Sequence, residues 1–266
     1  MKILIIGGGN MGLTYATSFL KGHVAKEADL MILEKSPERA AILATKNVGT
    51  VFGHPKDCLP KADLVILAVK PQDTNRLFDA IKAYIDPEQV FLSIMAGVKM
   101  STISTALGIK KVIRAMPNLP AQIGMGMTAF TSANTVTRIE LVSVQNLLNT
   151  TGKTVYLDDE AMLDAATAIS GSGPAYVYFF MQAMIQAAQD LGFTKSQAEL
   201  LVGQTFMGSI HLQNRNQLTC EEWIQKVSSK GGTTEAAMKV FKTTSLSDDI
   251  ISGTNAAFNR AVELGE

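Results

Sequence analysis

Three short segments hold the residues whose types and spacing could support chemistry. They are the glycine-rich run 7–12, the run SGSGPAY at 170–176 and the run SKGGTT at 229–234. None of the three contains a histidine, a cysteine or a pair of carboxylates. Glycines let a backbone approach a ligand closely and let N–H groups converge on it. The segments therefore indicate recognition by main-chain N–H groups rather than catalysis by a titrating side chain.

The first segment has the G-x-G-x-x-G spacing of a dinucleotide-binding turn, and it follows the apolar run KILII directly. The first glycine permits the turn, the second lets the backbone approach a pyrophosphate, and the third packs the helix on the strand. The helix N-terminus then offers N–H groups to the phosphates. The alternative is a glycine-rich turn without a ligand. We predict cofactor contacts at Gly7, Gly9, Asn10, Met11 and Gly12.

The identity of the cofactor, NADH or NADPH, depends on the end of the second apolar run. Glu34 ends that run, and a carboxylate there can accept hydrogen bonds from a ribose hydroxyl and repel a 2′-phosphate. Lys35 and Ser36 follow at once and could hold that phosphate. All three are also compatible with a helix cap and solvated charge before Pro37. The sequence leaves the choice open.

Later strand ends complete the predicted cofactor groove. Ligands of open parallel sheets bind outside the carboxyl ends of the strands, where AVKP, MAG and MPN occur here. Lys70, read alone, is equally compatible with a plain surface lysine. The residues predicted to line the groove are Ala68, Val69, Lys70, Pro71, Ala96, Gly97, Pro117 and Asn118.

Two kinds of architecture must position these segments. In the first part, short apolar runs at 2–6, 29–34, 63–69, 90–97 and 111–118 alternate with helical patterns. That alternation predicts an α/β domain over residues 1–158, with a Rossmann-type, doubly wound and mostly parallel sheet. Residues 159–266 are predicted to be all helical. The helices expected there span 160–169, 174–191, 195–214, 221–227, 234–242 and 248–263.

Composition narrows the class of protein. The 266 residues carry no formal net charge and 47% are apolar, which favours neither nucleic acid nor an acidic membrane as a partner. The uncharged stretch 165–189 is interrupted by glycine, proline and glutamine, so we expect there a helix buried in a core or in a subunit interface, and no membrane span. The two cysteines, Cys58 and Cys220, form no metal-ligand cluster and predict neither a metal site nor a disulfide framework. A cytoplasmic location is expected.

The motifs taken together resemble one family. GGGNMG at 7, AVKP at 68, IRAMPN at 113, SGSGPAY at 170 and GGTT at 231 occur in the order and spacing of pyrroline-5-carboxylate reductases, over nearly the whole chain. The resemblance implies a Rossmann domain followed by a helical dimerisation domain. It also implies reduction of L-1-pyrroline-5-carboxylate to L-proline by hydride transfer from NADH or NADPH, the last step of proline biosynthesis. A homodimer is implied as well, and larger rings of dimers occur in the family.

The same resemblance implies roles for individual residues. Thr234 is expected to contact the ring nitrogen of the substrate and, with Ser172, to form the catalytic pair. Glu160 falls at the position of the family's nicotinamide-side glutamate. The backbone N–H groups expected to hold the substrate carboxylate belong to the segment containing Ser229, Gly231, Gly232, Thr233 and Thr234.

Two positions depart from the family pattern. Lys230 stands where proline usually precedes the paired glycines, and Leu119 stands where threonine is common. The lysine puts the rigidity of the loop in question, although it adds positive charge beside a carboxylate. Neither change removes a group assigned to chemistry.

An acid–base dyad is not required for this reaction. A cyclic imine is more basic than a ketone and can carry its own proton, whereas alcohol and carbonyl substrates need a protein group for that purpose. Positioning then supplies much of the rate, and the cofactor supplies the hydride. Glycines, serines and threonines suffice for such a site.

Three other functions were weighed. A β-hydroxyacid dehydrogenase shares the glycine fingerprint, but it carries a catalytic lysine on the helix after a glycine-rich turn, and no lysine follows Gly173 as far as Gln189. Another imine reductase would use the same constellation on a related substrate. A non-catalytic dinucleotide-binding regulator would keep the fold without turnover, and the intact GGTT and SGSGPAY argue against it.

Overall fold

The computed structural model describes residues 1–265 of the chain. The chain forms two compact units, of which the first comprises Met1–Ser172 and the residues from Ala257 onward, and the second comprises Gly173–Ala256. The domain boundary expected between residues 158 and 159 stays a prediction.

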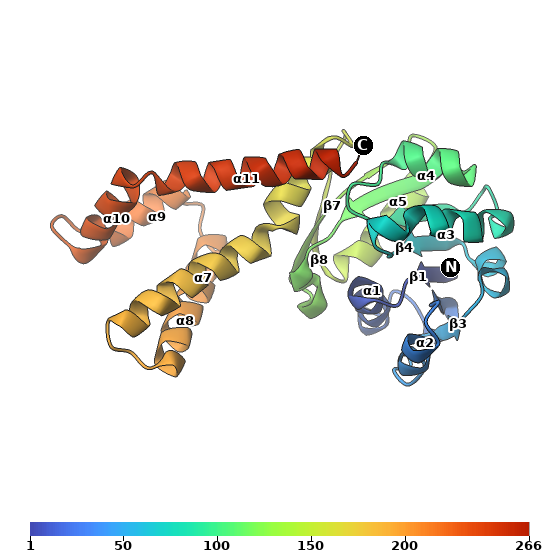
Figure 1. The fold of residues 1–266 in the computed structure, drawn as a ribbon, viewed down its shortest axis with the longest axis horizontal. Coiled ribbons are helices and arrows are strands. Elements are labelled where there is room, and N and C mark those ends of the chain that lie inside the picture. Colours follow the sequence, from blue (N-terminus) through green and yellow to red (C-terminus); the bar gives the residue numbers. More distant parts are fainter. Residues whose placement is uncertain (266) are drawn as a thin grey trace. The chain divides into compact units, whose positions relative to one another are not determined.

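The first unit is built on a sheet that has eight strands within the described residues, in the order β3-β2-β1-β4-β5-β6-β7-β8 (Figure 1). Neighbouring strands are parallel except β6 and β7, which are antiparallel. The mostly parallel, doubly wound sheet predicted from the sequence is thereby confirmed. The strands are β1 Ile3–Ile6, β2 Leu30–Leu33, β3 Thr50–Phe52, β4 Leu64–Leu67, β5 Val90–Ser93, β6 Val112–Met116, β7 Gly126–Ser132 and β8 Gly152–Tyr156.

Helices cover both faces of this sheet, which explains why β1, β2 and β4 are apolar at every position. Ile3 and Ile5 of β1 pack in one core with Phe19 of α1, whereas Leu4 and Ile6 pack in a second core, which also contains Phe78 of α3. The helices of the first unit are α1 Asn10–Lys21, α2 Pro37–Ala44, α3 Thr74–Ile81, α4 Met100–Leu107, α5 Arg138–Asn149 and α6 Met162–Ala166, and a π-helical turn, Thr167–Gly171, follows α6.

The second unit is helical throughout its regular structure. Its helices are α7 Gly173–Asp190, α8 Lys195–Asn214, α9 Cys220–Val227, α10 Thr233–Thr243 and α11 Leu246–Glu263, the last of which ends in the first unit. Thr194 and Thr219 begin α8 and α9 with capping boxes, in which a side chain three residues on bonds back to the cap. The predicted all-helical region is therefore confirmed. Among the described residues, the helices lack a segment both apolar and long enough to cross a bilayer.

Candidate active site

The glycine turn after β1 has the geometry of a phosphate cradle. Gly7 adopts a φ of 106°, and a Cβ on it would lie 2.7 Å from the carbonyl oxygen of Ala68. A Cβ on Gly12 would lie 2.0 Å from the carbonyl oxygen of Gly7, so α1 packs directly on the turn. Gly9 is the N-cap residue of α1 and has open space beside it, and no side chain caps the N–H groups that follow. The first N–H groups of α1 are thus available to an anion, and the cradle fits a pyrophosphate.

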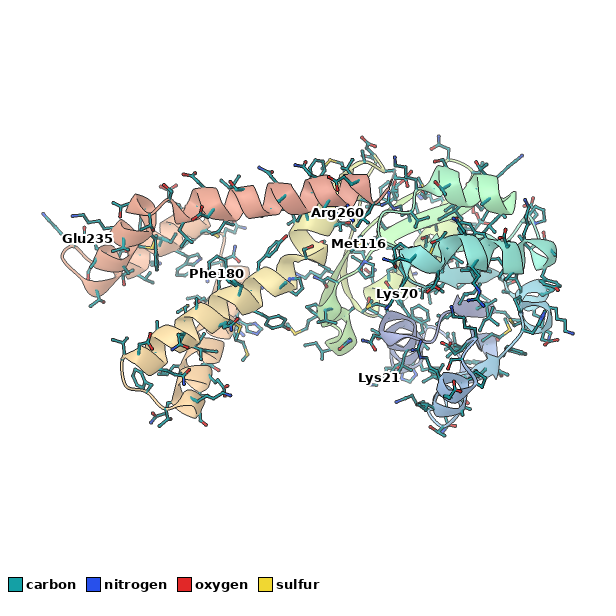
Figure 2. All side chains as sticks on the ribbon, viewed as in Figure 1. Lys21, Lys70, Met116, Phe180, Glu235 and Arg260 are labelled. Carbon is teal, nitrogen blue, oxygen red and sulfur yellow. The ribbon has the colours of Figure 1, made fainter. Side chains whose placement is uncertain are left out.

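The predicted groove residues share one edge of the sheet because the strand registers align there. Ile6, at the end of β1, pairs with Leu67 of β4, and Leu67 pairs with Ser93 of β5. Ser93 in turn pairs with Arg114 of β6. The structure therefore brings the turns that follow these strands to the same carboxyl edge, which holds Gly7–Gly12, Ala68–Pro71, Ala96–Gly97 and Pro117–Asn118. Lys70 is exposed at the turn after β4 (Figure 2).

Glu34 is already engaged by the protein. Its side chain is 5% exposed, and its two carboxylate oxygens accept hydrogen bonds from the N–H groups of Gly8 (3.0 Å) and Ser36 (2.9 Å). Ser36 caps α2 through its hydroxyl, and Lys35 is exposed and pairs with Asp73 at 3.2 Å. Lys35 and Arg39 are thus exposed cations at this corner, beside the carboxylates of Asp73 and Glu38.

Asn118 connects the cofactor edge to the π-helical turn. Its Nδ2 donates to the carbonyl of Ser170 at 3.0 Å, and its Oδ1 accepts from the N–H of Met127 at 2.9 Å. A Cβ on Gly171 would lie 2.7 Å from the terminal methyl group of Met116. A π-helical turn is uncommon and often marks a functional site. The serine–glycine segment 170–172 thus lies directly against the end of β6.

Glu160 belongs to a buried ion-pair network. Its Oε1 accepts from Nη1 of Arg114 at 3.1 Å and from the N–H of Met100, the first residue of α4, at 2.8 Å. Nη2 of Arg114 donates to Oδ1 of Asp164 at 3.0 Å. The Arg114 residue is only 3% exposed. The network joins β6, α4 and α6 beside the cofactor edge.

Arg114 and Asp164 did not emerge from sequence reasoning as site residues. One sequence signal could have identified Arg114, because it interrupts the apolar run KVIRAM of a predicted buried strand. A buried arginine must be paired, so a carboxylate partner follows from its burial. The partner itself, in a helix 50 positions away in the chain, follows only from the fold.

The segment 229–234 lies in the second unit, before α10. The carbonyl of Ser229 accepts from the N–H of Gly232 at 3.0 Å, which closes a tight turn, and Gly231 adopts a φ of 72°. A Cβ on Gly232 would lie 2.5 Å from Oγ of Ser229. Thr233 and Thr234 are the first two residues of α10, where helical N–H groups lack partners within the helix. This arrangement can bind an anion on main-chain donors.

The predicted site residues therefore divide between the units. The cofactor residues and Glu160 lie in the first unit, as does Ser172, whose N–H donates to the carbonyl of Thr167 at 2.8 Å. Ser229–Thr234 lie in the second. Their assigned roles remain predictions.

Two family models match the chain. Residues 160–264 match the family described as pyrroline-5-carboxylate reductase dimerisation, and residues 2–97 match NADP oxidoreductase coenzyme F420-dependent. The two matches fall on the helical region and on the glycine-turn region.

Known proteins are similar over the whole length. Pyrroline-5-carboxylate reductase of Pseudomonas aeruginosa is 33% identical over 100% of this chain and 97% of its own. A solved structure of a pyrroline-5-carboxylate reductase from Coxiella burnetii matches with a TM-score of 0.91 at 30% identity, covering 100% of this chain and 98% of that one. A Plasmodium falciparum pyrroline carboxylate reductase solved with NADP bound has the same fold, with a TM-score of 0.90 at 24% identity over 100% and 98% of the two chains.

Proposed function

The chain belongs to the pyrroline-5-carboxylate reductase family, and from that premise we propose how its residues carry out the reaction. The enzyme reduces L-1-pyrroline-5-carboxylate with NAD(P)H and one proton to L-proline and NAD(P)⁺. A hydride adds to the carbon of the C=N bond, and the ring nitrogen keeps a proton. The observation that carries our assignment of residues is the turn 229–232 leading into the open N-terminus of α10.

The first unit holds the cofactor. The N–H groups at the start of α1 would bind the pyrophosphate, and the turn after β4 would follow the dinucleotide along the sheet edge. Glu160, fixed by Arg114 and the N–H of Met100, would border the nicotinamide. When bound, the cofactor supplies the hydride. The protein orients the ring that donates it.

The second unit holds the substrate. The carboxylate of the imine is small, planar and negative, and it would accept from the N–H groups of Thr233 and Thr234, where the helix dipole also favours negative charge. The hydroxyl of Thr234 would contact the ring nitrogen, and Ser172 of the first unit would be the second catalytic residue. Since the protonated imine brings its own proton, none of these groups needs to titrate near neutral pH.

A pair of threonine variants on the same helix tests this assignment. Thr234→Ala removes a hydroxyl from the reacting end of the substrate, and we expect kcat/KM to fall about 100-fold, the typical cost of one transition-state donor. Thr243→Ala at the other end of α10 loses bonds only to the carbonyls of Lys239 and Val240, and we expect unchanged kinetics. Melting temperature should be similar in both variants. Unchanged turnover in Thr234→Ala would remove this residue from the site.

We infer further that NADPH is the better cofactor. The carboxylate of Glu34 is committed to two backbone N–H groups, which leaves it poorly placed to bind a ribose hydroxyl. Lys35 and Ser36 instead offer a cation and a helix N-terminus to a 2′-phosphate.

The proposal includes the assembly and its location. A homodimer, which the match to the dimerisation family supports, is the smallest functional unit. A larger ring of dimers, as the resemblance implies, would appear as a multiple of the dimer mass in light scattering. A cytoplasmic location agrees with Cys58 and Cys220 both being free thiols.

A further inference from the structure

The turn before α10 has the geometry of a type II β-turn. Its first carbonyl, on Ser229, bonds to the N–H of the fourth residue, Gly232. Lys230, the second residue, has a negative φ, whereas Gly231, the third, has a φ of 72°. A type II turn requires a positive φ at its third position and favours proline at its second. Lys230 therefore occupies the position where proline would make the turn rigid.

A side chain from the following helix secures this turn. The carboxylate of Glu235 accepts a hydrogen bond from the N–H of Gly231, with Oε2 at 2.6 Å from the nitrogen. Glu235 is the third residue of α10 and lies at the start of that helix in Figure 2. In an ordinary capping box, a glutamate at this position bonds to the N–H of the N-cap residue. Here it reaches one residue further, to the left-handed glycine itself.

The bond changes which donors remain for a ligand. With the N–H of Gly231 bound by Glu235 and the N–H of Gly232 bound by Ser229, the N–H groups of both glycines are satisfied. The N–H groups of Thr233 and Thr234 then point along the start of the helix as the donors left for an anion. A loop fixed in this way binds its ligand without first losing conformational freedom.

We propose that Glu235 is a positioning residue that holds the substrate turn in its binding conformation and takes over the part that proline at position 230 would play. The proposal rests on the proposed function, because the turn is useful to catalysis only if it binds the substrate carboxylate. Glu235 acts through Gly231 and does not touch the substrate.

Kinetics of four variants test the proposal, with L-1-pyrroline-5-carboxylate as the varied substrate and NADPH saturating. Glu235→Ala removes the acceptor, and we expect KM for the imine to rise about tenfold, the equivalent of losing one hydrogen bond to a charged group. Glu235→Gln keeps an oxygen acceptor and should stay within about twofold of the wild type. In all of these variants, KM for NADPH should not change, because the cofactor residues lie in the first unit.

Substitution of Lys230 by proline provides the decisive test of whether Glu235 takes the place of a rigid residue. Lys230→Pro alone should leave KM near the wild-type value, and Lys230→Pro combined with Glu235→Ala should restore most of the KM lost in Glu235→Ala. Glu222→Ala is the matched control, because Glu222 is the third residue of α9 and bonds to the N–H of Thr219 at 2.7 Å. It should lower the melting temperature as much as Glu235→Ala does and leave KM unchanged.

The opposite results would overturn the proposal. A lower KM in Glu235→Ala would show that this carboxylate competes with the substrate for the same donors. An unchanged KM, or a double variant no better than Glu235→Ala, would show that the bond has no part in binding.

Hydrogen exchange separates this proposal from the proposed function. The N–H of Gly232, which closes the turn, should exchange several-fold faster in Glu235→Ala and return to the wild-type rate in the double variant. If exchange changes as expected but the enzyme is inactive toward the imine, Glu235 does hold the turn, and the proposed substrate is wrong. If exchange at Gly232 does not change, Glu235 does not hold the turn.

Discussion

The two units differ in how they bury their apolar residues. Every residue of β1 is fully buried, and the first unit forms two cores, one on each face of its sheet. In the described part of α7, α9 and α10, by contrast, no residue is buried, and α8 buries only Ala198 and Val202. The first unit thus has cores of its own, whereas most apolar side chains of the second are exposed in the single chain, as expected of a surface that a second subunit covers.

The difference bears on function because we propose that each unit binds one ligand. The cofactor edge is formed by strand ends whose positions are fixed by a packed core. The turn 229–232, which we propose binds the substrate, lies between α9 and α10, and neither helix has a buried residue. We therefore expect its geometry to depend on local hydrogen bonds. Cofactor binding should therefore survive changes that abolish turnover, and the largest effects should come from the surface of the second unit.

The strongest test places a charge on that surface. Leu200 of α8 is 71% exposed in the single chain, and we expect Leu200→Glu to give a monomer with activity near background. The reason is that an unpaired carboxylate buried in an interface costs several kilocalories per mole. Light scattering measures the mass, and fluorescence titration should show that NADPH still binds.

Ile139 of α5 provides the matched control in the first unit. It is 81% exposed, more than Leu200, yet it lies on the unit that has cores of its own. Ile139→Glu should change the free energy of unfolding by less than about 0.5 kcal/mol and leave the dimer intact. If both glutamates acted alike, the contrast between the units would be wrong.

The second test removes the buried cation of the first unit. Arg114→Met leaves the carboxylates of Glu160 and Asp164 without their partner, and we expect a loss of about 3–5 kcal/mol in the free energy of unfolding. Arg260→Ala breaks the exposed pair with Glu263 and should cost at most about 1 kcal/mol (Figure 2). Urea denaturation measures both. Equal losses would contradict the burial argument.

The sequence predicted the fold well where apolar patterns were continuous. The runs that became β1, β2, β4, β5 and β6 were identified because both of their faces are buried. The short β3 and the antiparallel β7 were not, since Thr50–Phe52 is partly exposed and Gly126–Ser132 has no continuous apolar run. The helices of the second unit were predicted to within two residues at each end, with Lys195–Asn214 matching α8, whose start is marked by a cap at Thr194.

The site was less accessible from the sequence. Glycine spacing located the phosphate cradle, since the G-x-G-x-x-G pattern lies within six consecutive residues, even though a Cβ on Gly7 would meet the distant Ala68. The Arg114 network joins three elements that only the fold brings together, and the bond from Glu235 to Gly231 depends on a left-handed residue that sequence does not display. The first requires the tertiary fold to be known, and the second requires the backbone conformation of Gly231 to be known.

A third test concerns the cofactor corner of the first unit. Lys35→Ala should raise KM for NADPH about tenfold and leave KM for NADH unchanged, because only NADPH has the 2′-phosphate that the cation would bind. Asp73→Ala, which frees Lys35 from its ion pair, should lower KM for NADPH slightly. Steady-state assays with each cofactor measure the effect. Equal changes for NADH and NADPH would place Lys35 away from the 2′-phosphate.

The smallest effect compares one cysteine from each unit. Burial raises the pKa of Cys58 in the first unit to about 11, so at pH 8 its thiol is almost wholly protonated as well as covered. Cys220 begins α9 in the second unit and is exposed. Because the thiolate is the nucleophile, iodoacetamide at pH 8 should label Cys220 first, and labelling of Cys58 should accelerate as the pH rises toward 11. Mass spectrometry measures both rates, and urea-unfolded protein, in which the two thiols should react alike, provides the control.

Faster labelling of Cys58 in the folded protein would mean that the first unit opens more readily than the second, which would reverse the contrast between them.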